Sequence, residues 1–494
     1  MLNFSRSYEW IGLWWLPDEP DIKFYGALTY APDSGLLLKL NGGFNDWERE
    51  PSGYGTILLK MRSEPWRTIH GRSLGKSITL FEGVAIHSTG MPGRATPQYQ
   101  EIHIGSALFG VHISSIDDQV IEEIAVQHDH LNTWACYSGL FQKQPKNATD
   151  PEYKAVAGVQ RKEPFKAHSK DIEFVLEQII HPPTFVTKSG NETNEVGESW
   201  TFRMKKIKGA WSYDDVFDLY RLPADLVSLS THHSIGLLTL QANVQVPKDS
   251  GDSKDPETAY CDLLFEPPLI GSPEADGLEY YQRICNCENL DFAFAVPRWQ
   301  ELRSDARSVV GILIALKVKG RNIIENTLFM AIGAAESYHR KFLPQKAPFD
   351  RGEFKENRAL AVKSVPDDFG KFLKKAVRNE PTLRQRLQDL AAELDETVRE
   401  KILGDVDTWS AMATKVRNSI AHEGTTEEYS YDQVVAIRNS TELLVSMLFL
   451  QELGLSIEDQ IKALETHRVL RNVCFTAQRV FRPKEEQLKS TYKE

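Results

Sequence analysis

The chain of 494 residues lacks the motifs that mark two large enzyme classes. It has no G-x-x-x-x-G-K-[ST] phosphate loop and no H-E-x-x-H zinc segment. ATP hydrolysis on such a loop and zinc peptidase chemistry therefore lack their usual sequence signals. We predict no bound cofactor.

Long hydrophobic runs are also missing. The longest apolar runs lie around Val309–Leu316 and Leu443–Leu455, and both are too short to cross a bilayer. The segment Met1–Arg6 lacks the basic and apolar regions of a signal peptide. We therefore expect no membrane partner and a cytoplasmic location.

Cysteine is scarce, with five residues in the whole chain. Cys285 and Cys287 are closely spaced, but a C-x-C pair without a second pair is a weak signal for zinc. Together with Cys261 and either His232 or His233, this pair could assemble a metal site. We favour the alternative that the cysteines are reduced and structural, and we assign no metal.

Positive charge is in short supply, with 58 Lys and Arg against 69 Asp and Glu and a net charge of −11. The deficit is uneven along the chain. Residues 1–297 hold 26 basic and 40 acidic side chains, whereas residues 298–494 hold 32 and 29. The near-neutral C-terminal part can still present a local basic groove to a polyanion such as RNA.

The densest basic cluster lies in this C-terminal part and consists of Lys371, Lys374, Lys375 and Arg378. These side chains could dock RNA. The more common role of such lysines is to cover a solvated helix face.

The first part of the chain has the pattern of many short strands. Apolar and polar residues alternate between turn signals such as Gly42-Gly43 and Pro92-Gly93. The clearest expected strands are 22–30, 36–40, 77–81, 98–104, 172–179 and 200–207. This pattern predicts a β-sandwich of jelly-roll type, with a helix at 214–229 packed on it.

The tryptophans Trp10, Trp14 and Trp15 cluster in the first expected strands. They could form a stacking platform for a base or a sugar. We favour the alternative that they pack in the core and at the edge of the sheet, because burial is the usual role of aromatic side chains.

Helical periodicity replaces the strand pattern after Pro297. The expected helical segments are 299–319, 321–343, part of 350–382, 383–403 and 433–453. The fold class is therefore α+β and multidomain, with a β-rich domain followed by an all-α bundle. We place the β-rich domain at 1–296, the helical domain at 297–475 and a charged tail at 476–494.

The most informative segment is Arg417–His422, with the sequence RNSIAH. It combines a permanent cation, an amide and an imidazole, which are groups suited to cleaving RNA without a metal. Asp405 or Asp407 can cap the start of a helix here and Gly424 its end, so we expect a helix over 408–422.

Two faces of this expected helix differ in character. An apolar stripe for the core is formed by Trp409, Met412, Ala413, Val416 and Ile420. At about 100° per residue, Asn418 and His422 fall together on the opposite face, and Arg417 lies at its border. A core-filling histidine would lie on the stripe, so His422 is a candidate for chemistry.

Arg417 and His422 are five residues apart, which is about 140° around an ideal helix. One copy of the helix therefore cannot easily direct both side chains at the same phosphate. The residues around Asn418 and His422 are small, so a twofold-related copy could approach this face closely. We expect a homodimer or a higher assembly of dimers.

The groups fit a specific reaction on RNA. The 2′-hydroxyl would attack the phosphate, which requires no metal and spares DNA. His422 lies in the last turn of the helix, where exposed carbonyls favour its charged form, and it would protonate the leaving 5′-oxygen. Arg417 would hold the scissile phosphate through its guanidinium fork.

The segment resembles the signature of the HEPN superfamily of α-helical domains, with matches at Arg417, Asn418 and His422. Upstream, the stretch Glu325–Arg340 resembles the first core helix of the ApeA-like HEPN branch. The resemblance implies an endoribonuclease domain in which Arg417, Asn418 and His422 are the catalytic residues.

The N-terminal part is similar to the N-terminal domain of ApeA-type anti-phage proteins, at Trp10–Pro17, Gly26–Tyr30 and Gly35–Leu40. This resemblance implies a defence protein of the abortive-infection type. A phage-encoded trigger would release a nuclease that cleaves host or phage RNA, with tRNA as the expected substrate. The β-rich domain would then be the sensor or regulator.

Glu336 is a further candidate, because the resemblance implies that an acidic side chain on this helix can orient His422 or Arg417. The alternative is an ordinary intrahelical pair with Arg340, four residues on. We expect the neighbouring His339 at the surface or at an interface rather than in catalysis.

Two other functions remain open. The helical domain could be a non-catalytic HEPN module that binds a nucleotide or a partner protein. Alternatively, ligand binding by the β-rich domain could be the main activity, with the helices serving only to dimerise it. The presence of both Arg417 and His422 favours the enzyme.

Overall fold

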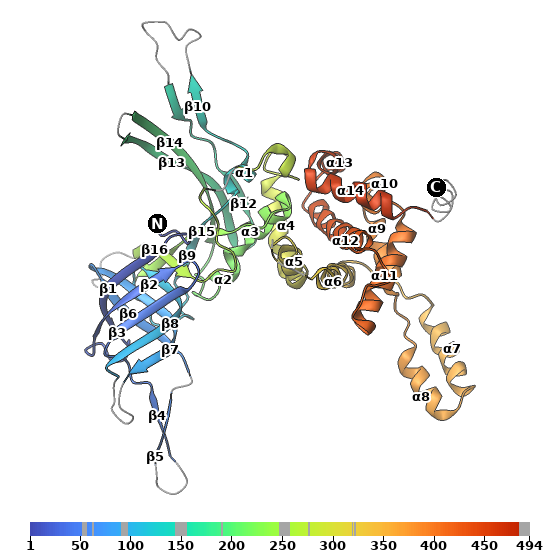
Figure 1. Ribbon diagram of the computed structural model, residues 1–494, viewed down its shortest axis with the longest axis horizontal. Helices are drawn as coiled ribbons and strands as arrows, with labels where there is room; N and C mark the ends of the chain where they lie inside the picture. The colour runs from blue at the N-terminus through green and yellow to red at the C-terminus, as the bar shows by residue number, and fades with distance from the viewer. Residues whose placement is uncertain are drawn as a thin grey trace. The chain divides into compact units, whose positions relative to one another are not determined.

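The computed structural model describes residues 1–51, 57–61, 64–89, 97–143, 156–188, 191–246, 257–274, 277–318, 320 and 323–483. These residues form two compact units (Figure 1). Unit 1 comprises residues 1–227 and 235–277, and unit 2 comprises residues 228–234 and 278–494. The expected tail lies outside the described residues from position 484 onward.

In the part of the chain that the structure describes, unit 1 is built on one antiparallel sheet of twelve strands. In chain order these are β1 (Tyr8–Trp15), β2 (Phe24–Ala31), β3 (Gly35–Asn41), β6 (Trp66–Ser73), β7 (Lys76–Thr89), β8 (Tyr99–Phe109), β9 (Ile121–His128), β12 (Phe165–His168), β13 (Ile172–Lys188), β14 (Asn191–Lys206), β15 (Leu237–Val246) and β16 (Glu257–Phe265). Two separate hairpins are β4 (Trp47–Pro51) with β5 (Ile57–Met61), and β10 (Leu140–Lys143) with β11 (Val156–Val159). Three short helices accompany the strands, namely α1 (Leu131–Ala135), α2 (Val216–Leu219) and α3 (Arg221–Thr231).

The first six strands of the large sheet close into a ring. The neighbours run β8-β3-β2-β1-β6-β7, and β7 pairs with β8 to complete the circle. The inside is filled by side chains that are fully buried, among them Trp14, Leu28, Leu38, Leu80 and Ile102. Gly71 makes room for Trp14, because a Cβ at position 71 would lie 2.2 Å from the indole ring.

The strand β8 joins this ring to the rest of the sheet. One edge of β8 pairs with β7, while the opposite edge pairs first with β3 and then, at Ser106–Phe109, with β16. From β16 the sheet continues through β15, β9, β14 and β13 to β12. The β-rich class is confirmed, but the arrangement is a closed ring with an extended sheet rather than the jelly-roll sandwich that alternation suggested.

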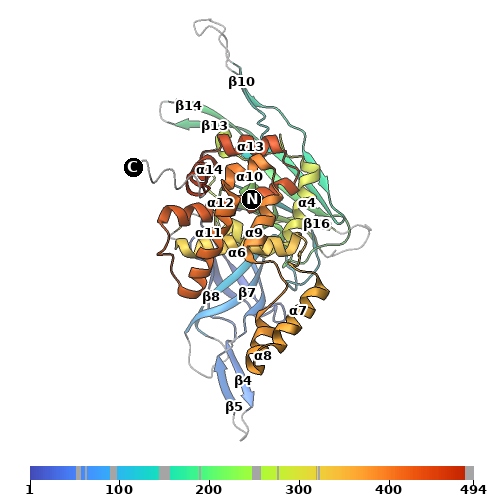
Figure 2. The same cartoon turned by 90° about the vertical axis from the view of Figure 1, so that its right-hand side faces the viewer.

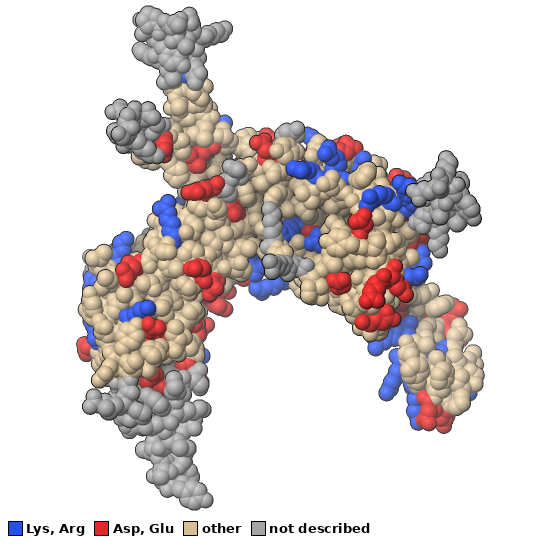
Figure 3. All heavy atoms as spheres, viewed as in Figure 1, with Lys and Arg blue, Asp and Glu red and all other residues tan. Residues whose placement is uncertain are grey.

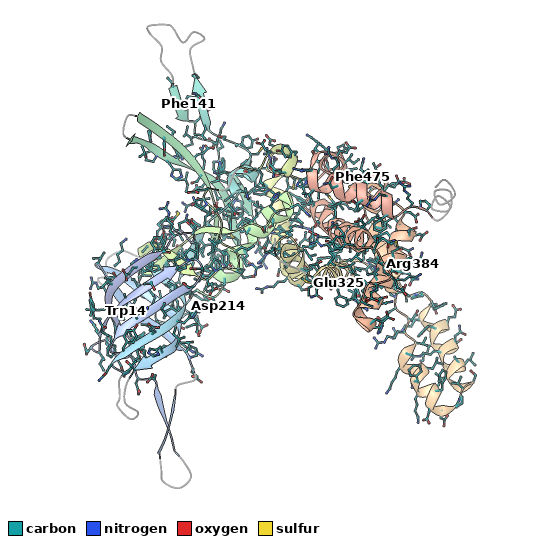
Figure 4. The ribbon with its side chains drawn as sticks, viewed as in Figure 1. Trp14, Phe141, Asp214, Glu325, Arg384 and Phe475 are labelled. Atoms are coloured by element: carbon teal, nitrogen blue, oxygen red, sulfur yellow. The ribbon has the colours of Figure 1, made fainter. Side chains whose placement is uncertain are left out.

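The tryptophan cluster is a packing feature. Trp14 is fully buried and donates its indole N–H to the carbonyl of Gly26 (Figure 4). Trp10 packs against the ring of Phe109 at 4.4 Å between centroids, and Trp15 packs edge-on against His112. These contacts therefore support the alternative in which the three tryptophans pack in the core and at the edge of the sheet.

Unit 2 is helical (Figure 2). Its α-helices are α4 (Phe292–Asp305), α5 (Arg307–Ala315), α6 (Ile324–Phe342), α7 (Arg351–Lys363), α8 (Asp367–Ala376), α9 (Leu383–Ala392), α10 (Glu396–Leu403), α11 (Val406–Glu423), α12 (Tyr431–Glu452), α13 (Ile457–Thr466) and α14 (Arg468–Val480). A short 3₁₀ helix, η1 (Tyr280–Gln282), precedes them. The prediction of a β-rich part followed by an all-helical part is confirmed.

Helix α12 is the centre of this bundle. The side chains from Ser440 to Leu450 are all buried, so the helix is enclosed on every side over three turns. It packs against α6, α14, α10 and α11. A helix was expected over 433–453, and α12 begins two residues earlier, with Ser430 as its N-cap in a capping box with Gln433.

Several expected helices are divided in the structure. The expected segment 299–319 is two helices separated at Ala306, and 383–403 is interrupted between Ala392 and Glu396. Helix α14 was not expected, and it continues through position 476 to Val480. The predicted boundary at 296 falls inside α4, and the three-part division of the chain stays a prediction.

None of the helices in the described part of the chain combines the length and the apolar character that crossing a bilayer requires. The cytoplasmic location stays a prediction.

Candidate functional site

Helix α11 carries the motif, and its ends form as the sequence predicts. The Asp405 carboxylate accepts hydrogen bonds from the backbone N–H and the hydroxyl of Thr408, which caps the helix start. At the other end Gly424 adopts a left-handed conformation with φ of 71°, which suits glycine. The expected helix is confirmed, with bounds at Val406 and Glu423.

The two faces of α11 agree with the prediction in most positions, although Met412 and Ile420 of the expected apolar stripe are only half-buried. Trp409, Ala413 and Val416 are fully buried, while Asn418 and His422 are exposed. Within the described residues, neither Asn418 nor His422 has a hydrogen-bonding partner. Their polar groups are therefore available to a ligand or to a second copy of the helix.

Arg417 lies at the border of this open face and is half-buried. Its guanidinium carbon lies 5.4 Å from the centroid of the Phe329 ring on α6. A cation over an aromatic face restricts the side chain and leaves the N–H donors at the edge free to bind an anion. This role of Phe329 was missed by sequence reasoning, because it depends on how α6 packs against α11.

The loop after the motif is anchored to the first turn of α6. The Thr426 hydroxyl donates to the carboxylate of Glu325 at 3.1 Å, and Figure 4 labels Glu325 on this helix. Helix α6 therefore contacts the motif helix through Phe329 and the following loop through Glu325. Both contacts fix the C-terminal end of α11, where His422 lies.

Glu336 forms the ordinary intrahelical pair. Its carboxylate accepts from the Nη2 of Arg340 at 2.9 Å, and both side chains belong to α6. The other role, orienting His422 or Arg417, stays a prediction.

The expectation that His339 lies at the surface is wrong. His339 is fully buried, and its Nε2 lies 3.0 Å from the Asp389 carboxylate while its Nδ1 lies 3.2 Å from the Nη1 of Arg386. Arg386 is itself buried and also donates to Gln345. A signal existed in the sequence, since His339 continues the helical spacing of buried Ala331, Ala335 and Tyr338.

The basic cluster lies in a different part of unit 2. Lys371, Lys374 and Lys375 belong to α8, Arg378 follows it, and all four are exposed. Lys371 pairs with Asp368 at 3.1 Å.

The cysteines do not gather into a metal site. Among the described residues, no group of three or more His, Cys, Asp or Glu side chains could hold a metal ion. Cys261 and Cys285 are buried, and burial raises the pKa of each thiol to about 12. A neutral buried thiol behaves as a small apolar side chain.

The β-rich unit and the helical unit with its R-N-x-x-A-H helix define a protein whose C-terminal part is a HEPN domain. Residues 9–266 match the family described as ApeA N-terminal domain 1, and residues 329–459 match the family described as Apea-like HEPN. The chain belongs to the ApeA family, and it is a HEPN-containing anti-phage defence protein. Searches of the curated proteins and of the solved structures returned no significant match.

Proposed function

We propose that the chain is a metal-independent endoribonuclease whose active site is built on α11. The observation that carries this proposal is the open face of the helix, which holds Asn418 and His422 with Arg417 at its border, all three without ion-pair or hydrogen-bond partners among the described residues. Polar groups of this kind, left unpaired on a well-anchored helix, are suited to an external ligand.

The proposed reaction transfers the phosphate within the RNA. The 2′-oxygen attacks phosphorus and the bond to the 5′-oxygen breaks, which leaves a 2′,3′-cyclic phosphate and a free 5′-hydroxyl. His422 in its charged form donates the proton to the departing 5′-oxygen, and the proton of the 2′-hydroxyl passes to a neutral imidazole or to water. Arg417 offsets the negative charge on the phosphate oxygens, and Asn418 donates to one of them.

We further propose that two copies of the chain form the site. On one helix Arg417 and His422 point in directions about 140° apart, so the histidine of one copy would serve the phosphate held by the other. Ala421 on the same face is exposed and small, which permits close approach of a twofold-related helix.

The substrate that we propose is host or phage RNA, with tRNA as the first choice. A nuclease of this kind has to be restrained in uninfected cells, and we assign that role to the β-rich part. A phage-encoded trigger would relieve it. The acidic excess of residues 1–297 supports a regulatory rather than an RNA-binding role for this part.

The decisive experiment incubates the purified full-length protein with total tRNA in EDTA and examines the ends of the products. We expect cleavage with 2′,3′-cyclic phosphate ends by the wild type and none by Arg417→Ala or His422→Ala. Phe475→Ala is the matched control, because Phe475 is exposed on α14 and distant in sequence from the motif. Absence of wild-type cleavage, or cleavage that EDTA abolishes, would overturn the mechanism.

The same variants test the non-catalytic alternative in cells. If Arg417→Ala and His422→Ala leave protection against phage intact, the helical domain acts as a binding module. If protection is instead lost only on changes to the β-rich part, ligand binding there is the main activity.

A further inference from the structure

The hairpin of α7 and α8 has almost no core of its own. Gly370 is the only residue of the two helices that is buried. A Cβ at this position would lie 3.0 Å from the carbonyl oxygen of Val362, so the helices touch closely at this point. Figures 1 and 2 show the hairpin projecting from the other helices of unit 2.

The base of the hairpin is fixed by polar contacts. Asn379 hydrogen-bonds both the N–H and the carbonyl of Phe349, at 3.1 and 2.8 Å, which ties the chain entering the hairpin to the chain leaving it. Next to this closure, buried Arg386 contacts His339 of α6 and Gln345 of the entering segment. These bonds hold the hairpin to α6 and α9 and set its direction.

Large apolar side chains on the hairpin face solvent. Phe369 and Phe372 of α8 are 53% and 62% exposed, with ring centroids 5.9 Å apart, and Leu360 of α7 is 66% exposed. Two neighbouring exposed phenylalanines are unusual on a surface that meets only water. Their placement indicates a surface that a partner covers.

Cations lie on the same short helix as these rings, and Lys375 follows Phe372 by three residues, about one helical turn. Lys374, Lys375 and Arg378 are exposed and, within the described residues, form no ion pair. Arg358 of α7 donates to the carbonyl of Val377, so this cation lies next to the C-terminal end of α8. Figure 3 shows Lys and Arg side chains along one side of this hairpin.

We propose that the α7–α8 hairpin is an RNA-docking arm, in which Phe369 and Phe372 stack on unpaired bases while Lys374, Lys375 and Arg378 bind the adjacent phosphates. The inference rests on the proposed nuclease function and names the surface that holds its substrate. Exposed cations and exposed aromatic rings on one short arm are the combination that binds single-stranded RNA. A membrane surface would be met by a wider apolar face than one pair of rings on a ten-residue helix.

Binding is measured on full-length His422→Ala protein, so that cleavage does not intervene. The probes are a fluorescent tRNA transcript and a fully paired RNA duplex, each at several salt concentrations. One arm variant is Lys374→Glu with Lys375→Glu and Arg378→Glu, and the other is Phe369→Ala with Phe372→Ala.

Helix α14 supplies the matched controls, because it also carries exposed cations and an exposed phenylalanine. The charge control is Arg468→Glu with Arg471→Glu, which reverses two charges and is compared with the arm variant per reversed charge, and the aromatic control is Phe475→Ala. All variants are compared by circular dichroism and thermal unfolding. If the double alanine variant unfolds, Phe369→Leu with Phe372→Leu keeps the apolar volume while removing the stacking surface.

We expect the charge variant to weaken tRNA binding by more than about tenfold. The slope of log affinity against log salt concentration should fall in magnitude by about 2, or roughly 0.7 for each lost phosphate contact. The aromatic variant should weaken tRNA binding about tenfold with an unchanged salt slope, and should affect the duplex much less. The α14 controls should stay within about twofold of the parent protein.

Equal affinities of arm and control variants would overturn the proposal. It would also be overturned if the arm variants bind RNA normally but lose binding to phosphatidylglycerol vesicles or change the oligomeric state, because a membrane or a second copy would then be the partner. If RNA binding depends on the arm but the wild type does not cleave, the docking arm is retained and the nuclease is rejected. If the wild type cleaves RNA and the arm variants keep full cleavage and unchanged affinity, the nuclease is retained and the docking arm is rejected.

Discussion

The guanidinium of Arg417 lies 5.4 Å above the ring of Phe329, so one side chain of the motif is held by an aromatic residue of another helix. We predict that Phe329→Leu lowers the single-turnover rate of RNA cleavage by about two- to fivefold, the equivalent of a cation–π contact at a partly exposed site. Leucine keeps the apolar contact but lacks the electron-rich ring face that orients the guanidinium.

The double variant Phe329→Leu with Arg417→Ala separates orientation from general damage. Because Arg417→Ala is expected to abolish cleavage, the readout for the double variant is tRNA affinity. If Phe329 acts through Arg417, its replacement weakens binding no further once the arginine is gone. An additional loss of the same size in the double variant would instead show that Phe329 acts on the fold of α6.

A mixture of two inactive variants tests whether the site is shared between copies. Arg417→Ala protein retains His422, and His422→Ala protein retains Arg417, so a mixed dimer contains one complete site if the two residues act across the interface. After co-expression with different tags, we expect roughly a quarter of the wild-type activity, since about half of the dimers are mixed and each has one of two sites. No recovery in isolated mixed dimers would place both residues of a site on the same copy.

The motif helix could be predicted because its determinants are local. Asp405 and Gly424 set its ends by capping rules, and Trp409 and Val416 set its buried face by spacing. The exposure of His422 then follows from geometry alone.

Features that depend on distant residues could not be predicted in this way. Alternation along β3 and β8 indicates two strands, but nothing local shows that they pair, with Leu36 opposite Ile104, and help to close the ring. The ion pair of Lys317 with Glu442 likewise joins positions 125 residues apart, and neither residue type is expected in a core.

The pair of Lys317 and Glu442 leads to a prediction about stability. Both side chains are buried, with Nζ and Oε1 2.6 Å apart, and Arg438 binds the other carboxylate oxygen at 2.7 Å. We predict that Lys317→Met destabilises unit 2 by about 3–5 kcal/mol, because it leaves a buried carboxylate short of one partner. Lys317→Met with Glu442→Leu should cost less, and hydrogen exchange in α5 and α12 measures both.

The same cluster predicts how unit 2 responds to acid. Burial alone would raise the pKa of Glu442, but the interactions with Lys317, His232 and Arg438 outweigh it and lower the pKa from 4.5 to about 2. A carboxylate whose pKa is lowered in the folded state stabilises that state at pH values above its ordinary pKa of 4.5. This contribution is lost as the pH falls from 4.5 toward 2. Glu442→Gln should therefore flatten the pH dependence of α12 exchange in that window, and an unchanged profile would contradict the assignment.

His128 predicts a second acid response, in unit 1. The side chain is 4% exposed, neither ring nitrogen has a partner among the described residues, and burial lowers its pKa from 6.5 to about 3. Between these values the unfolded chain binds a proton that the folded chain excludes, so stability falls as the pH drops from 6.5 toward 3. We predict that His128→Leu raises the thermal midpoint of unit 1 at pH 5, which corresponds to a gain of about 1–2 kcal/mol in the free energy of unfolding. The rise should be smaller at pH 8. The control is His168→Leu, because His168 is exposed, and it should leave the difference in thermal midpoint between pH 5 and pH 8 unaltered. An equal gain from His128→Leu at both pH values would show that packing rather than protonation is responsible.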